Sequence, residues 1–226
     1  MAENTAIRYE DVLAGAANYK RSVLNRYDRV LYVNCRFFWR CDRGELLRRY
    51  QAAVGARHLE IGVGSGYCPA HTLFPTPEPE ITLVDLNPQT LDFASRRLAH
   101  LRPRRVLANA LDPIEEAGVP TRHFDSVAIN LLLHCIPGDI KAKAAVLGNA
   151  AAAVKPGGKV VGSTVLAQGV PVTPAGRFLM RQLNAKGIFH NTEDRRDDLE
   201  SVLGKYFADY QLVVRGCMAM FTATVQ

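Results

Sequence analysis

A carboxylate followed by three alternating glycines is the pattern in this chain best suited to chemistry. Glu60 lies in a short apolar run, residues 58–61, that predicts a buried strand, and Gly62, Gly64 and Gly66 follow it. Because glycine lacks a Cβ atom and tolerates positive φ, glycines between a strand and a helix let the backbone approach a ligand closely. We therefore predict a cofactor site at the end of this strand, with the Glu60 carboxylate facing it.

A second carboxylate is expected at the same edge of the sheet. Asp85 ends the next apolar strand, residues 81–85, and lies 25 residues after Glu60. Parallel strands of a βαβ unit end at one edge, where an acidic residue can accept hydrogen bonds from both hydroxyls of a nucleoside ribose. Other residues expected there follow the second, third and fourth strands, and they are Leu86, Asn109, Ala110, Asn130 and Leu131.

The elements that must position these residues alternate along the chain. Apolar runs predict strands at residues 58–61, 81–85, 105–109, 124–130, 159–166, 210–214 and 217–225. Helical spacing predicts helices at residues 67–73, 88–98, 141–154, 175–185 and 197–207, with a turn at Lys155–Gly158. Strands alternating with helices are typical of an α/β fold with a parallel sheet.

The region before the first strand has a different character. Residues 8–54 show helical spacing, and Gly44 separates an aromatic segment, residues 34–41, from a helix that we expect to begin at Glu45. No internal repeat or linker interrupts the chain. We predict one domain, residues 1–226, with an N-terminal helical cap over about residues 1–55 and a core over about residues 56–226.

The order of these motifs resembles the class I S-adenosylmethionine-dependent methyltransferases. The features that match are the glycine loop, Asp85, the Asn109 region, the strand that begins at Phe124-Asp125 and the turn at Pro156-Gly157-Gly158. The resemblance implies a Rossmann-like sheet of seven mostly parallel strands, with an antiparallel strand in the C-terminal hairpin and helices on both faces. It also implies S-adenosylmethionine as cofactor and S-adenosylhomocysteine as product.

More detailed runs resemble a small group of microbial methyltransferases associated with natural-product chemistry. These runs are Gly66-Tyr67, Val84–Asn87, Leu133–Cys135, Arg177–Met180 and Gly187–Phe189. The resemblance implies methyl transfer to a small-molecule acceptor, at oxygen or nitrogen rather than at carbon.

The resemblance also implies roles for individual residues. The cofactor would be bound by Glu60, Gly62, Gly64, Gly66, Asp85, Leu86, Asn109, Ala110, Asn130 and Leu131. A helical lid would add Trp39 and Arg40, whereas an aromatic cluster of this kind is more often part of a core, and the sequence leaves both interpretations open for Tyr27, Trp39 and Arg40. The acceptor would contact Tyr27, Phe178 and His190, with Met180 and Phe189 nearby. These apolar and aromatic side chains favour a largely apolar acceptor.

His134 is the candidate general base, because it follows the fourth strand at the cofactor edge. A hydroxyl acceptor must lose a proton before it reacts, and histidine is the side chain whose pKa is most easily tuned near pH 7. In the alternative, the backbone satisfies His134 within a helical turn, and the sequence leaves both interpretations open. Cys135 is assigned to packing, because methyl transfer needs no covalent enzyme intermediate.

Cysteine usage and hydropathy exclude several classes of protein. Five cysteines without a C-x-x-C pair favour reduced thiols in the cytoplasm over a disulfide framework or a zinc site, and we predict no metal. No run of 18 apolar residues is present, and the first residues lack the order of a signal peptide, so we predict no membrane association.

The net charge of +6 leaves a second class of substrate open. Residues 1–58 hold eleven Arg or Lys and six Asp or Glu, so an RNA methyltransferase is one alternative, and a solvated surface is the interpretation that we favour. The segment Asn130–Leu133 lacks the N/D-P-P-Y/F motif of enzymes that methylate nucleic-acid amino groups. A cofactor-binding protein without transfer activity is another alternative, and the glycine spacing argues against a nicotinamide-dependent reductase. We expect a monomer or a homodimer.

Overall fold

Strands and helices alternate along the chain as the sequence pattern predicts. The computed structural model describes residues 7–226, in which seven strands hydrogen-bond in the order β3-β2-β1-β4-β5-β7-β6. Strand β7 is antiparallel to β5 and β6, and the other pairs are parallel. The strands are β1 (Arg57–Ile61), β2 (Glu80–Asp85), β3 (Arg104–Leu107), β4 (Phe124–Asn130), β5 (Val154–Val165), β6 (Asp209–Arg215) and β7 (Met218–Thr224).

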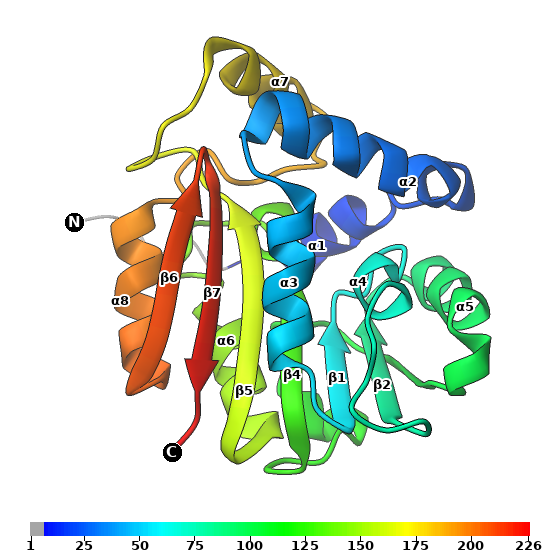
Figure 1. Cartoon of the computed structure of the whole chain (residues 1–226). Helices are drawn as coiled ribbons and strands as arrows, with labels where there is room; N and C mark the ends of the chain where they lie inside the picture. Colours follow the sequence, from blue (N-terminus) through cyan, green and yellow to red (C-terminus); the bar gives the residue numbers. More distant parts are fainter. Residues whose placement is uncertain (1–6) are drawn as a thin grey trace.

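Helices cover both faces of this sheet, as Figure 1 shows. The α-helices are α1 (Tyr9–Ala16), α2 (Arg21–Val33), α3 (Arg43–Ala53), α4 (Tyr67–Ala70), α5 (Pro88–Arg97), α6 (Ala144–Ala153), α7 (Pro174–Ala185) and α8 (Arg196–Tyr206). A π-helix, η1 (Asn34–Trp39), continues α2, and short 3-10 turns occupy η2 (Ala99–Leu101), η3 (Ile114–Ala117) and η4 (Leu133–Cys135). The predicted fold class is confirmed.

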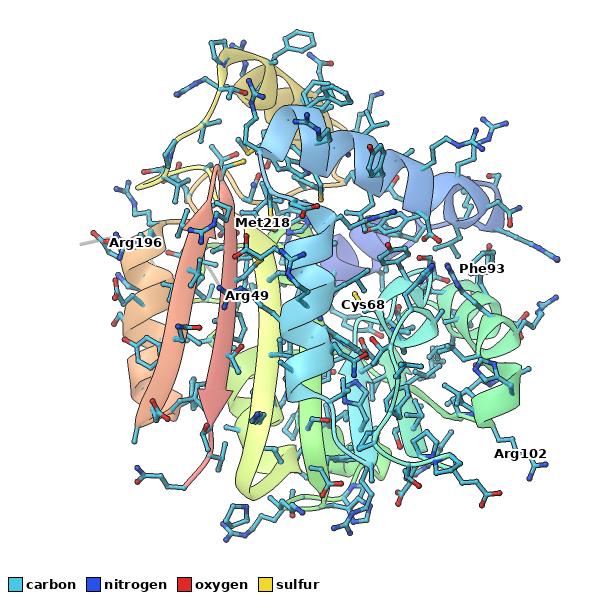
Figure 2. All side chains as sticks on the ribbon, viewed as in Figure 1. Arg49, Cys68, Phe93, Arg102, Arg196 and Met218 are labelled. Carbon is cyan, nitrogen blue, oxygen red and sulfur yellow. The ribbon has the colours of Figure 1, made fainter. Side chains whose placement is uncertain are left out.

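The two faces of the sheet bury separate cores. Helix α3 packs on β5 and β7, and Tyr50 of α3 is fully buried there with Met218 of β7. Figure 2 labels Met218 at the start of β7 and Arg49 on α3. Helices α6 and α8 cover the opposite face, where Phe124 and Phe221 are fully buried. The strands are therefore held from both sides, which fixes the positions of their carboxyl ends.

Helices α1 and α2 lie above the carboxyl ends of β1 and β2 in Figure 1. Beyond them, α7 packs against η1, where a Cβ atom on Gly176 would lie 2.8 Å from the carbonyl oxygen of Phe38. The segment that connects α7 to α8 is fastened by a buried ion pair, in which Lys143 Nζ lies 2.7 Å from Asp194 Oδ1. The N-terminal helices and this connection form a second layer above the sheet edge.

Some predicted boundaries were wrong. Gly44 lies inside α3, which begins at Arg43, two residues before the predicted start at Glu45, because the Asp42 side chain accepts a hydrogen bond from the Gly44 N–H. The chain reverses instead at Arg40, whose φ is 55°. Residues 155–158 form no separate turn, because they make a bulge within β5, between the pairs Phe124–Val154 and Ser126–Lys159. No helix in residues 7–226 is long and apolar enough to cross a membrane.

Candidate active site

A deep cavity opens where the carboxyl ends of the central strands meet the N-terminal helices. It measures about 1020 Å³ with its open mouth included. Its floor is formed by the ends of β1, β2 and β4 and by the glycine loop, and its roof is formed by α1, α2 and their connection. Cys68 lines the cavity below α2, in the region where Figure 2 labels it.

The glycine loop is shaped by backbone geometry that only glycine adopts easily. Gly62, Gly64 and Gly66 have φ values of 74°, 55° and 68°. A Cβ atom on Gly62 would lie 2.7 Å from Leu132, whereas a Cβ atom on Gly64 would meet nothing within 4 Å. Gly64 therefore presents bare backbone to the open cavity. Gly66 does not line the cavity, and its missing side chain lets the loop pack against Ala94 of α5.

Glu60 reaches the cavity from a buried hydrogen-bond network. Its Oε1 atom accepts hydrogen bonds from the Tyr50 hydroxyl and from His58 Nε2, the latter at 2.9 Å. His58 Nδ1 lies 2.7 Å from Ser126 Oγ, which itself accepts from the Gly55 N–H. A carboxylate oxygen only accepts, so the hydrogen bond between His58 Nε2 and Glu60 Oε1 requires the His58 proton on Nε2, which leaves Nδ1 to accept from the Ser126 hydroxyl. The network holds one carboxylate oxygen and orients the side chain at the floor.

Asp85 ends β2 with its carboxylate inside the cavity. Burial raises the pKa of Asp85 to about 6, and hydrogen bonds from the backbone N–H groups of Asn87, Gly64, Leu86 and Val63 oppose that rise. The Asn87 N–H lies 2.9 Å from Asp85 Oδ1. The carboxylate is thus held between the glycine loop and the start of α5, where it can accept hydrogen bonds from a ligand.

Two groups of side chains join the roof to the floor. Asp28 of α2 accepts a hydrogen bond from Ser65 Oγ at 2.7 Å and pairs with Arg97 of α5 at 2.7 Å. Asn87 Nδ2 donates to the carbonyl oxygens of Ala16 and Tyr19, at 2.9 and 3.1 Å. The roof is therefore closed over the glycine loop and Asp85 by side-chain contacts.

The upper part of the cavity is a mostly apolar chamber with two tyrosines, Tyr19 and Tyr27, whose ring centroids lie 6.0 Å apart. Its apolar lining includes Val12, Leu31, Leu132 and Ile136. Burial raises the pKa of both tyrosines, and the nearby Cys135 thiol adds to the effect, so both hydroxyls stay protonated at neutral pH. The chamber is suited to a largely apolar ligand.

Comparison with known proteins assigns the chain to a family. A family profile described as a methyltransferase domain matches residues 59–160, which include the glycine loop, Asp85 and β4. Demethylluteothin O-methyltransferase from Streptomyces thioluteus is 44% identical over 215 residues, which cover 95% of this chain and 92% of the relative. Methyltransferase ctvB from Aspergillus terreus is 36% identical over 92% of this chain and 93% of its own length.

The chain belongs to the S-adenosylmethionine-dependent methyltransferases. It groups with class I enzymes that methylate small molecules in natural-product pathways, as the sequence motifs predicted. Solved structures share the fold: an O-methyltransferase family protein from Burkholderia thailandensis has a TM-score of 0.63 and 23% identity, over 81% of this chain and 55% of its own. The N-methyltransferase NodS from Bradyrhizobium japonicum, solved with S-adenosylhomocysteine, has a TM-score of 0.56 and 14% identity. The match covers 80% of this chain and 84% of the NodS chain.

The floor of this methyltransferase fits S-adenosylmethionine. The bare face of Gly64 leaves room for close approach of a ligand, and the carboxylates of Glu60 and Asp85 lie at either side of the loop. Ten residues that the sequence assigned to cofactor or acceptor line the cavity, namely Glu60, Gly62, Gly64, Asp85, Leu86, Asn109, Ala110, Asn130, Leu131 and Tyr27. Within residues 7–226, no group of three or more His, Cys, Asp or Glu side chains is arranged to hold a metal ion.

The geometry argues against His134 as general base. The η4 turn directs Cys135 into the cavity and His134 toward β5, where the ring is buried against Phe189 with centroids 4.3 Å apart. His134 Nδ1 accepts the Val165 N–H at 3.2 Å, so its proton lies on Nε2 and neither nitrogen offers a free lone pair. Burial, with a contribution from the Lys143 charge, lowers the pKa of His134 to about 3.

Four other predicted contacts also lie away from the cavity. Trp39 is the last residue of η1, where its buried ring stacks on Phe189, and Arg40 is exposed where the chain reverses. Phe178 lies on the outer face of α7 and is 57% exposed. His190 packs against Gly15 of α1 and donates its backbone N–H to the His134 carbonyl oxygen. The helical segment between α2 and α3 faces the C-terminal hairpin rather than the cofactor edge, since Cys217 N donates to Trp39 O.

Sequence reasoning missed several residues of the roof. Tyr19 lies in the connection between α1 and α2, and Asp28 lies on the polar side of α2, where neither has a distinguishing spacing. Asn87 caps α5, since its side chain accepts a hydrogen bond from Gln89 N, and nothing local in the sequence indicates that its Nδ2 atom also donates to Ala16 and Tyr19. Cys135, which the sequence assigned to packing, lines the cavity, and its position five residues after the end of β4 was the available signal.

Proposed function

We propose that this methyltransferase moves the methyl group of S-adenosylmethionine to a heteroatom of a small, largely apolar metabolite in a natural-product pathway. The observation that carries the proposal is a single cavity that joins the glycine loop and Asp85 to the apolar chamber under α1 and α2. The relative from Streptomyces thioluteus is named as an O-methyltransferase, and a relative from Penicillium aethiopicum, N-methyltransferase vrtF, is 33% identical. Both names favour a heteroatom acceptor.

The floor of the cavity binds and orients the cofactor in this proposal. Asp85 accepts hydrogen bonds from the ribose hydroxyls, and Gly62 and Gly64 let the backbone lie against the methionine portion. Glu60 faces the same portion from its network with Tyr50 and His58. Bound S-adenosylmethionine supplies a methyl group made electrophilic by its positively charged sulfur.

The roof positions the acceptor and keeps out water. Leu31, Leu132 and Ile136 surround the chamber with apolar atoms, and the contacts of Asp28 and Asn87 hold α1 and α2 over it. Alignment of the acceptor in a closed, dry chamber is the main way in which a protein accelerates such a transfer. We place the acceptor against Tyr27, Leu131 and Asn130 at the boundary of the two halves.

Two measurements test the proposal. Calorimetry with S-adenosylhomocysteine is expected to give a dissociation constant in the low micromolar range, roughly −8 kcal/mol. Incubation of apolar metabolite extracts with S-adenosylmethionine that carries a deuterated methyl group should give a product that contains the label. Absence of S-adenosylhomocysteine binding contradicts the cofactor assignment, and binding without any labelled product supports a protein that binds the cofactor without transfer.

We propose further that the enzyme works in the cytoplasm on small molecules rather than on nucleic acid. All five cysteines are unpaired, and four of them are buried, which suits a reducing compartment. A monomer or a homodimer stays our prediction for its assembly, and light scattering at several concentrations measures it.

A further inference from the structure

The outer side of the helical layer above the cavity is rich in positive charge. In Figure 1, α2 and α7 lie at this outer end of the molecule, and η1, which continues α2, packs against α7. Asp28 is the only acidic residue in residues 20–41, and residues 174–192 contain none. The same two segments hold nine exposed cations, namely Lys20, Arg21, Arg26, Arg29, Arg36, Arg40, Arg177, Arg181 and Lys186.

None of these nine cations pairs with a carboxylate in residues 7–226, where every ion pair uses other residues. Asp28 turns toward the floor, where it pairs with Arg97. Exposed cations elsewhere do find partners: Arg96 pairs with Asp92, and Lys141 pairs with Asp198. The outer side of α2, η1 and α7 therefore carries charge of one sign that is open to an anionic partner.

Exposed apolar side chains gather on the same three elements. Of the ten large apolar or aromatic side chains that are exposed in residues 7–226, six lie here, namely Val23, Val30, Tyr32, Val33, Phe37 and Phe178. Contact of such side chains with water is unfavourable, and apolar groups surrounded by charge mark interaction surfaces on proteins. We call these six side chains and the nine cations the arginine-rich surface.

On α2 and η1 the exposed apolar side chains form a stripe. Its members recur at intervals of three and four residues, which places them along one side of the helix, and they are Val23, Arg26, Val30, Val33 and Phe37. On the other side of α2, Tyr27 and Leu31 line the cavity. Helix α2 therefore covers the cavity with one side and presents the stripe to solvent with the other.

The combination of charge and apolar groups restricts what can cover this surface. A second copy of the chain would bring arginine against arginine, with no carboxylate on either side to relieve the repulsion. Nucleic acid would neutralise the charge, but the valine side chains have no flat face on which a base can stack. A bilayer with anionic headgroups satisfies both parts, because arginine stays among the headgroups while aliphatic and aromatic side chains enter the edge of the acyl region.

We propose that the arginine-rich surface docks this methyltransferase on a membrane that carries anionic phospholipids. The cytoplasmic leaflet has the negative surface potential that such a surface requires. Docking would place the helix that covers the cavity against the bilayer, where a largely apolar acceptor accumulates. That consequence for the acceptor rests on the proposed function, whereas the docking itself is measured with lipid vesicles alone.

This proposal departs from the prediction of no membrane association that the sequence suggested. That prediction depended on the lack of a long apolar run and of a signal peptide, and neither feature is needed for docking at a surface. The proposal also gives a role to two side chains that lie away from the cavity. Phe178 and Arg40, which were expected to contact acceptor and cofactor, both belong to the arginine-rich surface.

The test measures binding of the whole protein to vesicles of phosphatidylcholine, with and without about 30% phosphatidylglycerol. We expect binding to the anionic vesicles only, and weaker binding as salt is raised from roughly 0.1 M to roughly 0.5 M. Arg26→Gln/Arg29→Gln should weaken binding by about 25-fold, about fivefold for each charge. The matched control is Arg102→Gln/Arg122→Gln, which removes two exposed arginines before β3 and β4, at the opposite edge of the sheet. Figure 2 labels Arg102 well away from α2.

A second pair of variants tests the apolar part of the surface. Phe37→Ser should weaken binding to anionic vesicles by about fivefold, because less apolar area enters the bilayer. Leu73→Ser is its control, since Leu73 is 84% exposed on the loop between α4 and β2, and it should change binding by less than about twofold. All these side chains are exposed, and circular dichroism checks that each variant is folded.

Three results would overturn the proposal. One is absence of binding to anionic vesicles by the folded wild type. Another is an equal loss in the two double arginine variants, which would assign the attraction to net charge rather than to this surface. The third is wild-type binding by Phe37→Ser, which would leave a purely electrostatic contact and favour an anionic polymer such as RNA. A protein that binds vesicles as expected but fails to bind S-adenosylhomocysteine would contradict the proposed function and leave the docking surface intact.

Discussion

The floor of the cavity is backbone fixed by parallel strands, whereas its roof is two helices held by a few side-chain hydrogen bonds. The ends of β1, β2 and β4 are fixed by their sheet pairing and by helices on both faces. The roof depends on Asp28, Asn87 and the apolar contacts of α1 and α2. From this difference we predict that the floor is preorganised and that the roof opens more easily than the floor.

The largest effect should follow from a side chain placed on the floor. We expect Gly64→Val to weaken binding of S-adenosylhomocysteine by about 100-fold or more, about 2.7 kcal/mol, because the new atoms occupy ligand space at a positive φ. Calorimetry measures the affinity. Gly157→Val is the matched control, because Gly157 has a φ of 76° and open surroundings in the β5 bulge, away from the cavity. Equal losses of affinity in the two variants would mean that backbone strain, and not occupation of the site, is responsible.

The charge of Asp85 should make the affinity of the floor for S-adenosylhomocysteine depend on pH. Because burial raises its pKa to about 6, the carboxyl group is ionised above that pH and protonated below it. We expect affinity for S-adenosylhomocysteine to fall as the pH drops from about 8 to about 5, since a protonated carboxyl accepts hydrogen bonds from the ribose less strongly. Asp85→Asn should weaken binding by about 1.5–3 kcal/mol at pH 8 and remove most of the pH dependence. A variant with the same pH profile as the wild type would assign the titration to another group.

The same pKa has a consequence for the stability of the unliganded protein. Asp85 has a pKa near 3.9 in the unfolded chain, so the folded state binds the extra proton between about pH 4 and pH 6. Its contribution to stability therefore falls as the pH rises through that range. Denaturation of the wild type and Asp85→Asn across the range measures this difference, with the sign opposite to that for an ion-paired carboxylate.

Substitutions in the roof should have smaller effects than those in the floor, and they should change how fast the ligand leaves and how fast backbone amides exchange. Asp28→Ala removes the bonds to Ser65 and Arg97, and we expect release of S-adenosylhomocysteine to quicken about fivefold, about 1 kcal/mol for partly exposed groups. Amide exchange should quicken in residues 9–33 and stay unchanged in β1. Asp11→Ala is the control, because Asp11 pairs with Arg8 at the exposed surface of α1. Faster exchange in β1 as well would show that roof and floor open together.

The smallest effect is expected at His134. Its side chain lies behind the cavity with a pKa of about 3, so it carries no charge that titrates between about pH 5 and pH 9. We expect His134→Asn to lower turnover by less than about tenfold, under 1.4 kcal/mol, and to keep the wild-type pH profile. A loss of about 100-fold together with a changed profile would restore His134 as a base.

How far the sequence could predict the site depends on how its residues are spaced. Glu60, Gly62, Gly64 and Asp85 could be assigned to a shared edge because each follows a recognisable strand, and parallel strands end together. Trp39 and Arg40 were assigned to the same edge wrongly, because nothing local reveals that a π-helix turns this segment toward the C-terminal hairpin.

The sequence by itself determined the order of strands and helices, the loop that only glycine can form and the family to which the chain belongs. These depend on local periodicity and on backbone conformations available to each residue type. Only the tertiary structure decided that His134 faces β5, that Asn130 keeps an unpaired donor and that Asp28 and Asn87 fasten the roof. Side-chain direction at the end of a strand depends on which distant groups satisfy its hydrogen bonds, and for Asn130 that group, Ser163, lies 33 residues further along the chain.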